Sequence, residues 1–316
     1  MIQKKKTDVF GGKMGSFMIR TDLALEARES VEDGAEELRG VSVEEFCNEQ
    51  SEIKVTKVII ESKNSAKVLG KPIGTYVTIE APAMSQPDLE YHKEISGELA
   101  RQLRQMLPDV KEEISVMVVG LGNREVTADA LGPNVVDNII ITRHMIREFG
   151  KAAYQNKEKM HMISGLIPGV MAKTGMESAE IIKGVVEKTK PDVVLVIDAL
   201  AARSTKRLNR TIQITNTGIH PGSGVGNHRN SVTRESMGVP VIAIGVPTVV
   251  DAATIVMDAM ERLIGNASED PPELKEELQK NIGEFYNMYV TGKDVDYEIK
   301  QISHIICDAI HEALEV

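Results

Sequence analysis

Two aspartates follow two short apolar runs in the middle of the chain. Asp129 comes shortly after the run at 114–119, beyond the loop GLGN, and Asp198 directly follows the run at 193–197. Both runs are rich in β-branched residues, which is typical of strands buried on both faces. In a parallel sheet, reactive groups gather just beyond the carboxyl ends of neighbouring strands. If these two strands are neighbours, both carboxylates face one crevice.

Paired carboxyl groups of this kind can catalyse hydrolysis. Two close carboxyl groups cannot both ionise cheaply, so they share one proton and titrate as a pair. One member then activates a water molecule while the other protonates the leaving amine. This chemistry cleaves an amide bond without a nucleophilic side chain, a metal ion or a cofactor. The alternative is structural, with Asp129 capping a helix that begins near Ala130 and Asp198 capping the turn after its strand.

Two glycine-rich loops border the predicted crevice. The first, GLGNRE, contains Gly120, Gly122 and Asn123, but Glu125 occupies the last glycine position of a dinucleotide fingerprint. We interpret it as a tight turn that shapes the site.

The second glycine-rich loop, HPGSGVGN at 220–227, lacks the Lys-Ser/Thr ending of a P-loop, and its proline stands where a nucleophile elbow needs glycine. His220, Gly222 and Ser223 are therefore assigned to the cleft border as substrate-binding residues. Two alternatives stay open: His220 and the two aspartates holding a divalent metal ion, or a non-hydrolytic protein that binds an anion or nucleotide through backbone N–H groups.

A cationic cluster follows Asp198 within a turn or two. It consists of Arg203, Lys206 and Arg207. Such a cluster beside a carboxylate crevice can bind an acidic substrate side chain, because guanidinium groups pair well with carboxylates. A solvated helix face explains the same residues equally well.

The elements around these residues alternate between strand and helix. A third apolar run lies at 239–246, and helical patterns lie at 132–149, 178–190 and 248–264. This alternation predicts an α/β fold, a three-layer sandwich with a largely parallel central sheet. Further patterns predict a hairpin of strands 55–60 and 75–81 around the turn LGKPIG, an amphipathic helix at 87–107, and C-terminal helices at 272–289 and 294–315.

Composition excludes several classes of protein. The chain has 316 residues, 42% of them hydrophobic, and a formal net charge of −10. This length permits one large or two modest domains, and the net acidity disfavours a protein that binds nucleic acid by neutralising its phosphates. Cys47 and Cys307 show no metal-ligand spacing and indicate a reducing compartment. Neither a secretory segment nor an 18-residue apolar run is present, so we expect a cytoplasmic protein without a membrane partner.

Several ordered motifs together resemble one protein family. They are GLGN at 120–123, TADALGP at 127–133, NIIITRH at 138–144, IPGVMAKTG at 167–175, IDALAARS at 197–204, TGIHPGSGVGN at 217–227 and VPVIAIGVPTVVDA at 239–252. The chain closely resembles the germination protease family of spore-forming bacteria, from about residue 20 to its C-terminus. The resemblance implies an endopeptidase of atypical aspartic type that degrades small acid-soluble spore proteins during germination, in the forespore or spore core.

The resemblance also assigns residues and an assembly. The two proposed catalytic aspartates of the family fall on Asp129 and Asp198. The family is made as a zymogen that removes its own N-terminal segment, and it forms a homotetramer. Its substrates are cut after the first glutamate of a motif Thr/Ser-Glu-apolar-Ala-x-Glu. Residues 21–26 read TDLALE, in which Asp22 takes the place of that glutamate. We therefore expect self-cleavage between Asp22 and Leu23.

This cleavage divides the chain into a propeptide, residues 1–22, and a catalytic domain, residues 23–316, within which a region at about 50–85 is a candidate small lobe. The acidic residue before the cleaved bond requires a cation, for which we select Arg203 and Arg124. A looser likeness links the stretch 120–133 to the hydrogenase maturation proteases, which suggests the same sandwich fold and keeps a metal-dependent peptidase as an alternative.

Overall fold

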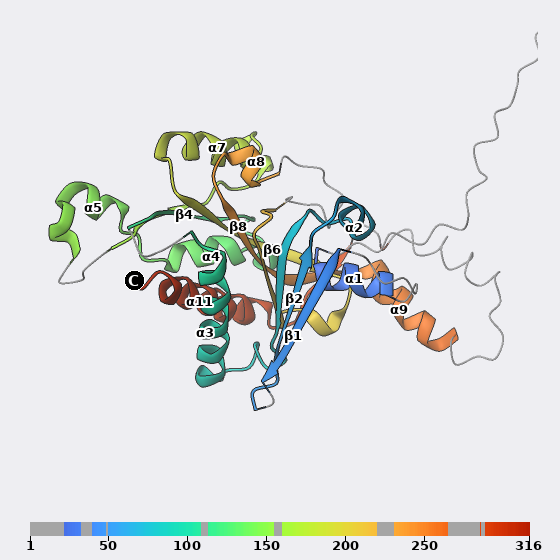
Figure 1. Cartoon of the computed structure of the whole chain (residues 1–316). Helices are drawn as coiled ribbons and strands as arrows, with labels where there is room; N and C mark the ends of the chain where they lie inside the picture. Colours follow the sequence, from blue (N-terminus) through green and yellow to red (C-terminus); the bar gives the residue numbers. More distant parts are fainter. Residues whose placement is uncertain are drawn as a thin grey trace, which may run out of the picture.

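The computed structural model describes residues 22–32, 40–48, 50–108, 113–154, 160–219, 231–264, 285 and 288–316. These residues form one mixed sheet with helices on both faces (Figure 1). The strand order is β1-β2-β3-β7-β8-β6-β4-β5, and a short ninth strand, β9 (Tyr289–Val290), pairs with β8. The α/β sandwich predicted from the sequence is confirmed.

The parallel half of the sheet contains the three strands predicted from apolar runs. It consists of β5 (Met162–Leu166), β4 (Ser115–Gly120), β6 (Val193–Ala202) and β8 (Val241–Asp251), which pair in that order. Every residue of β4 is buried, as expected for a strand covered by helices on both faces. Strands β4 and β6 are direct neighbours, so the condition for a shared crevice is met.

The antiparallel half extends the same sheet. It consists of β7 (Thr211–Thr215), β3 (Gly74–Glu80), β2 (Ile53–Ile60) and β1 (Val41–Asn48). Strands β2 and β3 pair as the hairpin prediction requires, but helix α2 (Lys63–Leu69) connects them in place of a tight turn. The side chain of Ser62 caps this helix, and Gly70 ends it with a left-handed φ of 62°.

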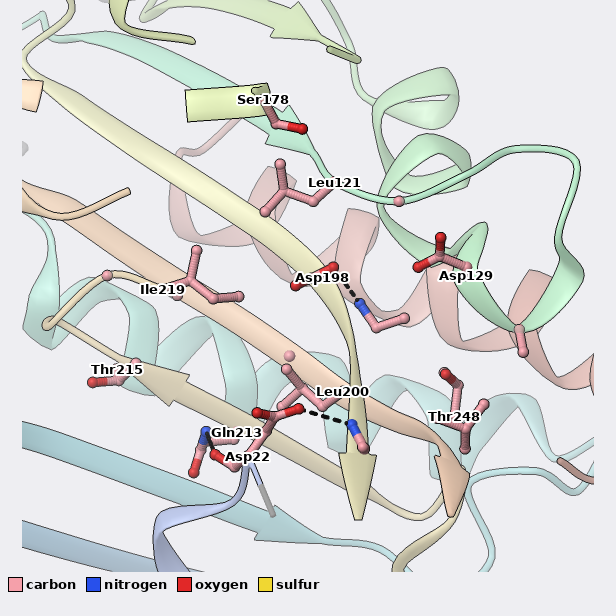
Figure 2. Close-up of a pocket in the computed structure, with 18 of the residues that line it drawn as sticks. Asp22, Leu121, Asp129, Ser178, Asp198, Leu200, Gln213, Thr215, Ile219 and Thr248 are labelled. Atoms are coloured by element: carbon pink, nitrogen blue, oxygen red, sulfur yellow. Dashed lines mark hydrogen bonds between the residues drawn. The ribbon is translucent and has the colours of Figure 1, made fainter. Parts of the chain in front are cut away.

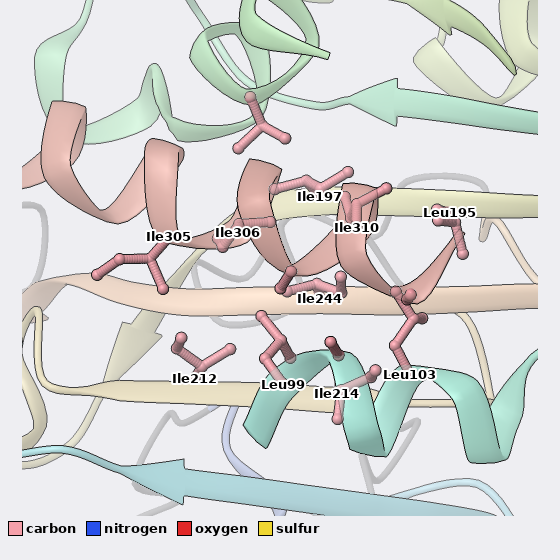
Figure 3. Packing of buried hydrophobic residues seen from close by; sticks show 14 of the residues in the cluster. Leu99, Leu103, Leu195, Ile197, Ile212, Ile214, Ile244, Ile305, Ile306 and Ile310 are labelled. Carbon is pink, nitrogen blue, oxygen red and sulfur yellow. The ribbon is translucent and has the colours of Figure 1, made fainter. Parts of the chain in front are cut away.

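One face of the sheet is covered by α3 (Leu89–Met106), α4 (Leu131–Asn138) and α11 (Val295–Ala313). The apolar residues of α3 recur at Ile95, Leu99 and Leu103, so they form a single stripe. Figure 3 shows this stripe and the isoleucines of α11 packed against the strands β6, β7 and β8. This layer is the main hydrophobic core of the described residues.

The opposite face carries smaller clusters and the polar side chains of the sheet. Helices α7 (Ser178–Thr189) and α8 (Arg234–Met237) cover its parallel half, and α1 (Ala24–Glu32) packs with α2 against its antiparallel half. Side chains alternate along each strand, so β7 turns Ile212 and Ile214 toward the main core and Gln213 toward this second face.

The remaining described elements are η1 (Thr127–Asp129), α5 (Arg143–Phe149), η2 (Gly150–Tyr154), α6 (Met171–Thr174), η3 (Thr205–Arg207) and α9 (Ala252–Ile264). The helix expected at 132–149 is divided into α4 and α5, because the backbone is extended at Ile139 and Thr142, at the start of α5, forms two hydrogen bonds with the backbone beside β5. The helix expected at 272–289 lies mostly outside the described residues. None of the described helices is long and apolar enough to cross a bilayer.

Candidate active site

A cavity of about 400 Å³ opens on the second face of the sheet, toward the carboxyl ends of β4 and β8. Both predicted aspartates line it, and so does Asp22 from the segment before α1 (Figure 2). Lys71 is the lining residue with a cationic side chain among those the structure describes. The cavity therefore brings three carboxyl groups and one amine together.

Asp198 lies within β6 rather than beyond its end. The strand continues to Ala202 because the small and apolar residues after Asp198 keep pairing with β8, with an irregularity at Leu200. The side chain of Asp198 is 9% exposed, and its Oδ1 accepts a hydrogen bond from the N–H of Ala199 at 3.0 Å. The alternative role as a turn cap is wrong, since no turn follows Asp198.

Asp129 ends the short helix η1, which packs against α11, α4, β6 and β8. Its Oδ2 accepts a hydrogen bond from the N–H of Asn123 at 2.7 Å, so the loop after β4 fixes the carboxylate. The helix that follows, α4, has Ala130 at its N-cap and no side-chain capping bond. The alternative role of Asp129 as the cap of this helix is therefore also wrong.

Glycines allow the loop carrying Asn123 to approach Asp129 closely. Gly122 has a φ of +113°, which disfavours any residue with a side chain, and a Cβ there would overlap the backbone of Asp129. A Cβ on Gly120 would overlap the backbone of Gly132. These two glycines therefore let the loop pass close to Asp129 and Gly132.

The segment predicted to be cleaved is docked in this cavity. The N–H of Asp22 donates to the carbonyl oxygen of Ala201 at 3.1 Å, and Oδ2 of Asp22 accepts from the N–H of Ala201 at 3.0 Å. The carbonyl oxygen of Asp22 accepts from Nζ of Lys71 at 2.8 Å and from Nε2 of Gln213 at 3.3 Å. Leu23 is fully buried against Leu200 and its neighbours.

The last acidic residue of the motif, Glu26, is bound by backbone and side-chain donors. Its carboxylate accepts hydrogen bonds from the N–H groups of Arg203, at 2.8 Å, and Ser204, at 3.1 Å. The guanidinium of Arg207 lies 3.3 Å from Glu26 and also pairs with Glu29 and Glu80. Burial lowers the pKa of Arg207, but the hydrogen bonds that Arg207 donates to Glu29 and the charges of Glu29, Glu26 and Glu80 outweigh burial and raise this pKa overall.

The two arginines selected from the sequence do not line the cavity. Arg124 pairs with Asp137 on the surface, and Arg203 contributes its backbone N–H to Glu26. We selected these arginines because they lie near the two aspartates in the sequence. The amine beside Asp22 instead belongs to Lys71, which lies between α2 and β3. Arg207, from the same cationic cluster as Arg203, supplies the guanidinium that pairs with the docked segment.

Other predicted residues are not tested. His220, Gly222 and Ser223 lie outside the described residues. Within the described part of the chain, no group of three His, Cys, Asp or Glu side chains is arranged to hold a metal ion. The proposed ligand set of His220 with the two aspartates therefore includes one residue whose position is not described.

Two residues of the site, Lys71 and Gln213, were not identified from the sequence. Gln213 is a long amide inside the otherwise β-branched run TIQIT. A polar side chain in a buried strand needs a hydrogen-bond partner, so its presence there could have marked Gln213 as a candidate site residue. Lys71 lies in LGKPIG, which the sequence analysis interpreted only as a turn. Its role depends on a contact with a segment distant in the sequence, which no local pattern reveals.

The fold and the cavity define an α/β protein with a carboxylate-lined site that already contains an acidic peptide segment. A family model described as germination protease matches residues 18–280. The chain is 47% identical to a germination protease of Caldanaerobacter subterraneus subsp. tengcongensis, over 94% of both chains. It is 44% identical to one of Clostridium tetani, over 94% of this chain and 95% of that protein, and 37% identical to one of Bacillus mycoides, over 95% of both. The chain belongs to the germination protease family, and it is accordingly a peptidase.

Proposed function

We propose that this chain is a spore endopeptidase made as a zymogen that cleaves itself between Asp22 and Leu23. In the proposal, small acid-soluble spore proteins are its substrates in the spore core, and the active assembly is a homotetramer without direct nucleic-acid contacts. The observation that carries the proposal is that Asp22, in a segment resembling the family's cleavage motif, lines the same cavity as Asp129 and Asp198.

The proposed reaction uses Asp129 and Asp198 as a pair that shares one proton. The ionised member removes a proton from a water molecule as the water attacks the carbonyl carbon of Asp22. The protonated member gives its proton to the nitrogen of Leu23 as the C–N bond breaks. Water and peptide are thereby converted into a carboxyl group on Asp22 and an amino group on Leu23.

Substrate recognition follows from the same docked segment. An incoming protein with the motif can form the contacts of Asp22 with Ala201 and of Glu26 with Arg207. The anion-binding alternative is disfavoured by charge, since a cavity lined by three carboxyl groups and one amine repels a phosphate. Docking of an acidic motif is compatible with this cavity because the pairing partners are backbone N–H groups and the two cations.

Replacing either aspartate by asparagine tests the proposal. The full chain carrying Asp129→Asn or Asp198→Asn is held at mildly acidic pH, and mass spectrometry follows the appearance of a chain beginning at Leu23. We expect each variant to slow processing by about 10²–10⁴-fold, the usual contribution of a general acid or base. Circular dichroism and thermal melting verify that both variants fold.

Asp137→Asn serves as the matched control, since Asp137 pairs with Arg124 outside the cavity. It receives the same chemical change and should process at the rate of the unmodified chain. Normal trimming by either active-site variant would contradict the proposed pair. Loss of activity on chelation would instead favour the metal-dependent alternative.

A further inference from the structure

The carbonyl oxygen of Asp22 is held by two side chains from different parts of the sheet. Nζ of Lys71 donates to it at 2.8 Å, and Nε2 of Gln213 donates to it at 3.3 Å. The same Gln213 side chain also accepts a hydrogen bond from the N–H of Ala24 at 2.7 Å through its Oε1. Its amide group therefore spans the Asp22–Leu23 peptide bond and fixes the backbone on both sides of it.

Both donors are attached to rigid supports. Lys71 directly follows the left-handed cap of α2, and its own N–H donates to the carbonyl oxygen of Ala66 at 3.1 Å. Gln213 lies in the interior of the sheet, paired with Thr78 of β3 and Gly245 of β8. Preorganised donors of this kind need no rearrangement when charge develops on the atom they hold.

The sheet register relates these donors to the aspartates. Gly245 pairs with Gln213 on one side and with Asp198 on the other. Directly paired residues point to the same face of a sheet, and adjacent strands lie about 4.8 Å apart, so Asp198 and Gln213 share a face at a spacing of about 10 Å. Gly245 has no side chain, and the side chain of Leu200 packs over it between Asp198 and Gln213, since a Cβ on Gly245 would lie 2.4 Å from Cδ1 of Leu200.

The charge of Lys71 suits this place. Burial lowers the pKa of its amine, while the nearby carboxylates of Asp22 and Glu26 oppose that shift. In a partly desolvated cavity, a cation stabilises a neighbouring anion far more strongly than it does in water. Among the described lining residues no other cationic side chain is available for this purpose.

We propose that Lys71 and Gln213 form the oxyanion-binding site for cleavage of the Asp22–Leu23 bond. This inference rests on the proposed self-cleavage. As the oxygen of water bonds to the carbonyl carbon of Asp22, the electron pair of the C=O double bond moves to the carbonyl oxygen. Lys71 and Gln213 stabilise the resulting negative charge by their two hydrogen bonds. When the C–N bond breaks, the pair returns to the C=O bond and the Leu23 nitrogen leaves with a proton.

The test measures self-processing of the full chain in Lys71→Met, Lys71→Arg and Gln213→Glu. Hydrogen exchange of residues 23–32 reports in parallel whether α1 remains docked. We expect Lys71→Met to reduce the processing rate constant by about 10²–10³-fold, the usual effect of removing one oxyanion donor, with α1 still docked. Lys71→Arg keeps a cationic donor and should recover at least a tenth of the rate.

Gln213→Glu adds a distinct signature because it changes the charge with almost no change in shape. An ionised carboxylate repels the developing oxyanion, whereas a protonated one donates to it again. The processing rate of this variant should therefore rise, relative to that of the unmodified chain, as the pH falls through the carboxyl pKa. Lys67→Met is the control. Lys67 is an exposed lysine of α2, the helix that precedes Lys71, and this variant should process normally.

Each outcome decides the inference. Processing of Lys71→Met within threefold of the unmodified chain overturns it, and so does loss of α1 docking in that variant, since Lys71 then acts only by holding the segment. Failure of the proposed function is recognised separately, because it appears as normal processing in Asp129→Asn or Asp198→Asn. If those variants are inactive and Lys71→Met is normal, the endopeptidase stands and the oxyanion site does not.

Discussion

The two acidic residues of the docked motif are bound in different ways. The carboxylate of Asp22 accepts a hydrogen bond from the backbone N–H of Ala201 and lies near the amine of Lys71. Glu26 is nearly fully buried and interacts with the guanidinium of Arg207, whose side chain is 13% exposed. Removing one partner of a buried ion pair leaves an uncompensated charge, so the second contact should dominate the stability of docking.

A double-mutant cycle on Glu26 and Arg207 tests this difference. We expect Glu26→Gln and Arg207→Gln each to lower the opening free energy of α1 by about 1.5–3 kcal/mol, the usual value of a charged hydrogen bond. The double variant should lose little more than either single variant, because the pair is already broken. Hydrogen exchange of residues 23–32 measures the opening free energy.

Arg210→Gln is the control for this cycle, because Arg210 is an exposed arginine of the same segment. It should leave the exchange of α1 unchanged. Strictly additive losses in the double variant would show that Glu26 and Arg207 do not act on each other.

At the scale of elements, the loop after β4 determines where Asp129 lies. The strand is buried and rigid, and Gly122 turns the chain so that the N–H of Asn123 reaches the carboxylate of Asp129. The backbone of this loop therefore determines where the carboxyl group of Asp129 lies.

Gly122→Ala should disturb this geometry without touching the docked segment. The positive φ and the overlap with the backbone of Asp129 predict a loss of more than about 1 kcal/mol in the free energy of unfolding, together with slower self-processing. Gly184→Ala within α7 is the contrasting control, since a Cβ there meets no atom within 4 Å and alanine stabilises a helix by roughly 0.5–1 kcal/mol relative to glycine. Urea unfolding measures both effects, and equal stability of the two variants would contradict the argument.

The elements differed in how far the sequence could predict them. The buried strands at 114–119, 193–197 and 239–246 and the helices α3, α7 and α11 were recognisable because burial on one or both faces leaves a clear periodicity. The division of the helix at 132–149 was not, because the hydrogen bonds of Thr142 beside β5 arise only in the folded sheet. Asp129 and Asp198 were recognisable as carboxylates that follow buried apolar runs, although Asp198 lies within β6. Lys71 and Gln213 depend on contacts between distant segments.

At the scale of the whole molecule, the docked segment and the cavity belong to one chain. The segment from Asp22 to Glu26 is held by Lys71, which follows α2, and by residues of β6, β7 and η3. A tethered segment has an effective concentration far above that of a separate molecule in dilute solution. Self-cleavage should therefore proceed within a subunit or within a stable assembly.

Two measurements test this intramolecular route. The first-order rate constant of processing should remain unchanged when the protein is diluted a hundredfold. An excess of unmodified chain should leave separately folded Asp198→Asn chains uncut, as seen by mass spectrometry of an isotopically labelled variant. A rate proportional to protein concentration would indicate cleavage between molecules.

The complete burial of Leu23 has a consequence for the step after hydrolysis. Before cleavage this position carries a neutral peptide N–H beside an apolar cluster formed with Leu200, Ala202 and Val250. After the proposed cleavage, the Leu23 nitrogen would become an ammonium group, and Asp22 would gain a second carboxylate in the cavity that Asp129 and Asp198 also line. Burying unpaired charges costs several kcal/mol, so we expect the proposed cleavage to weaken the docking of Asp22 and α1 and to open the cavity to another polypeptide.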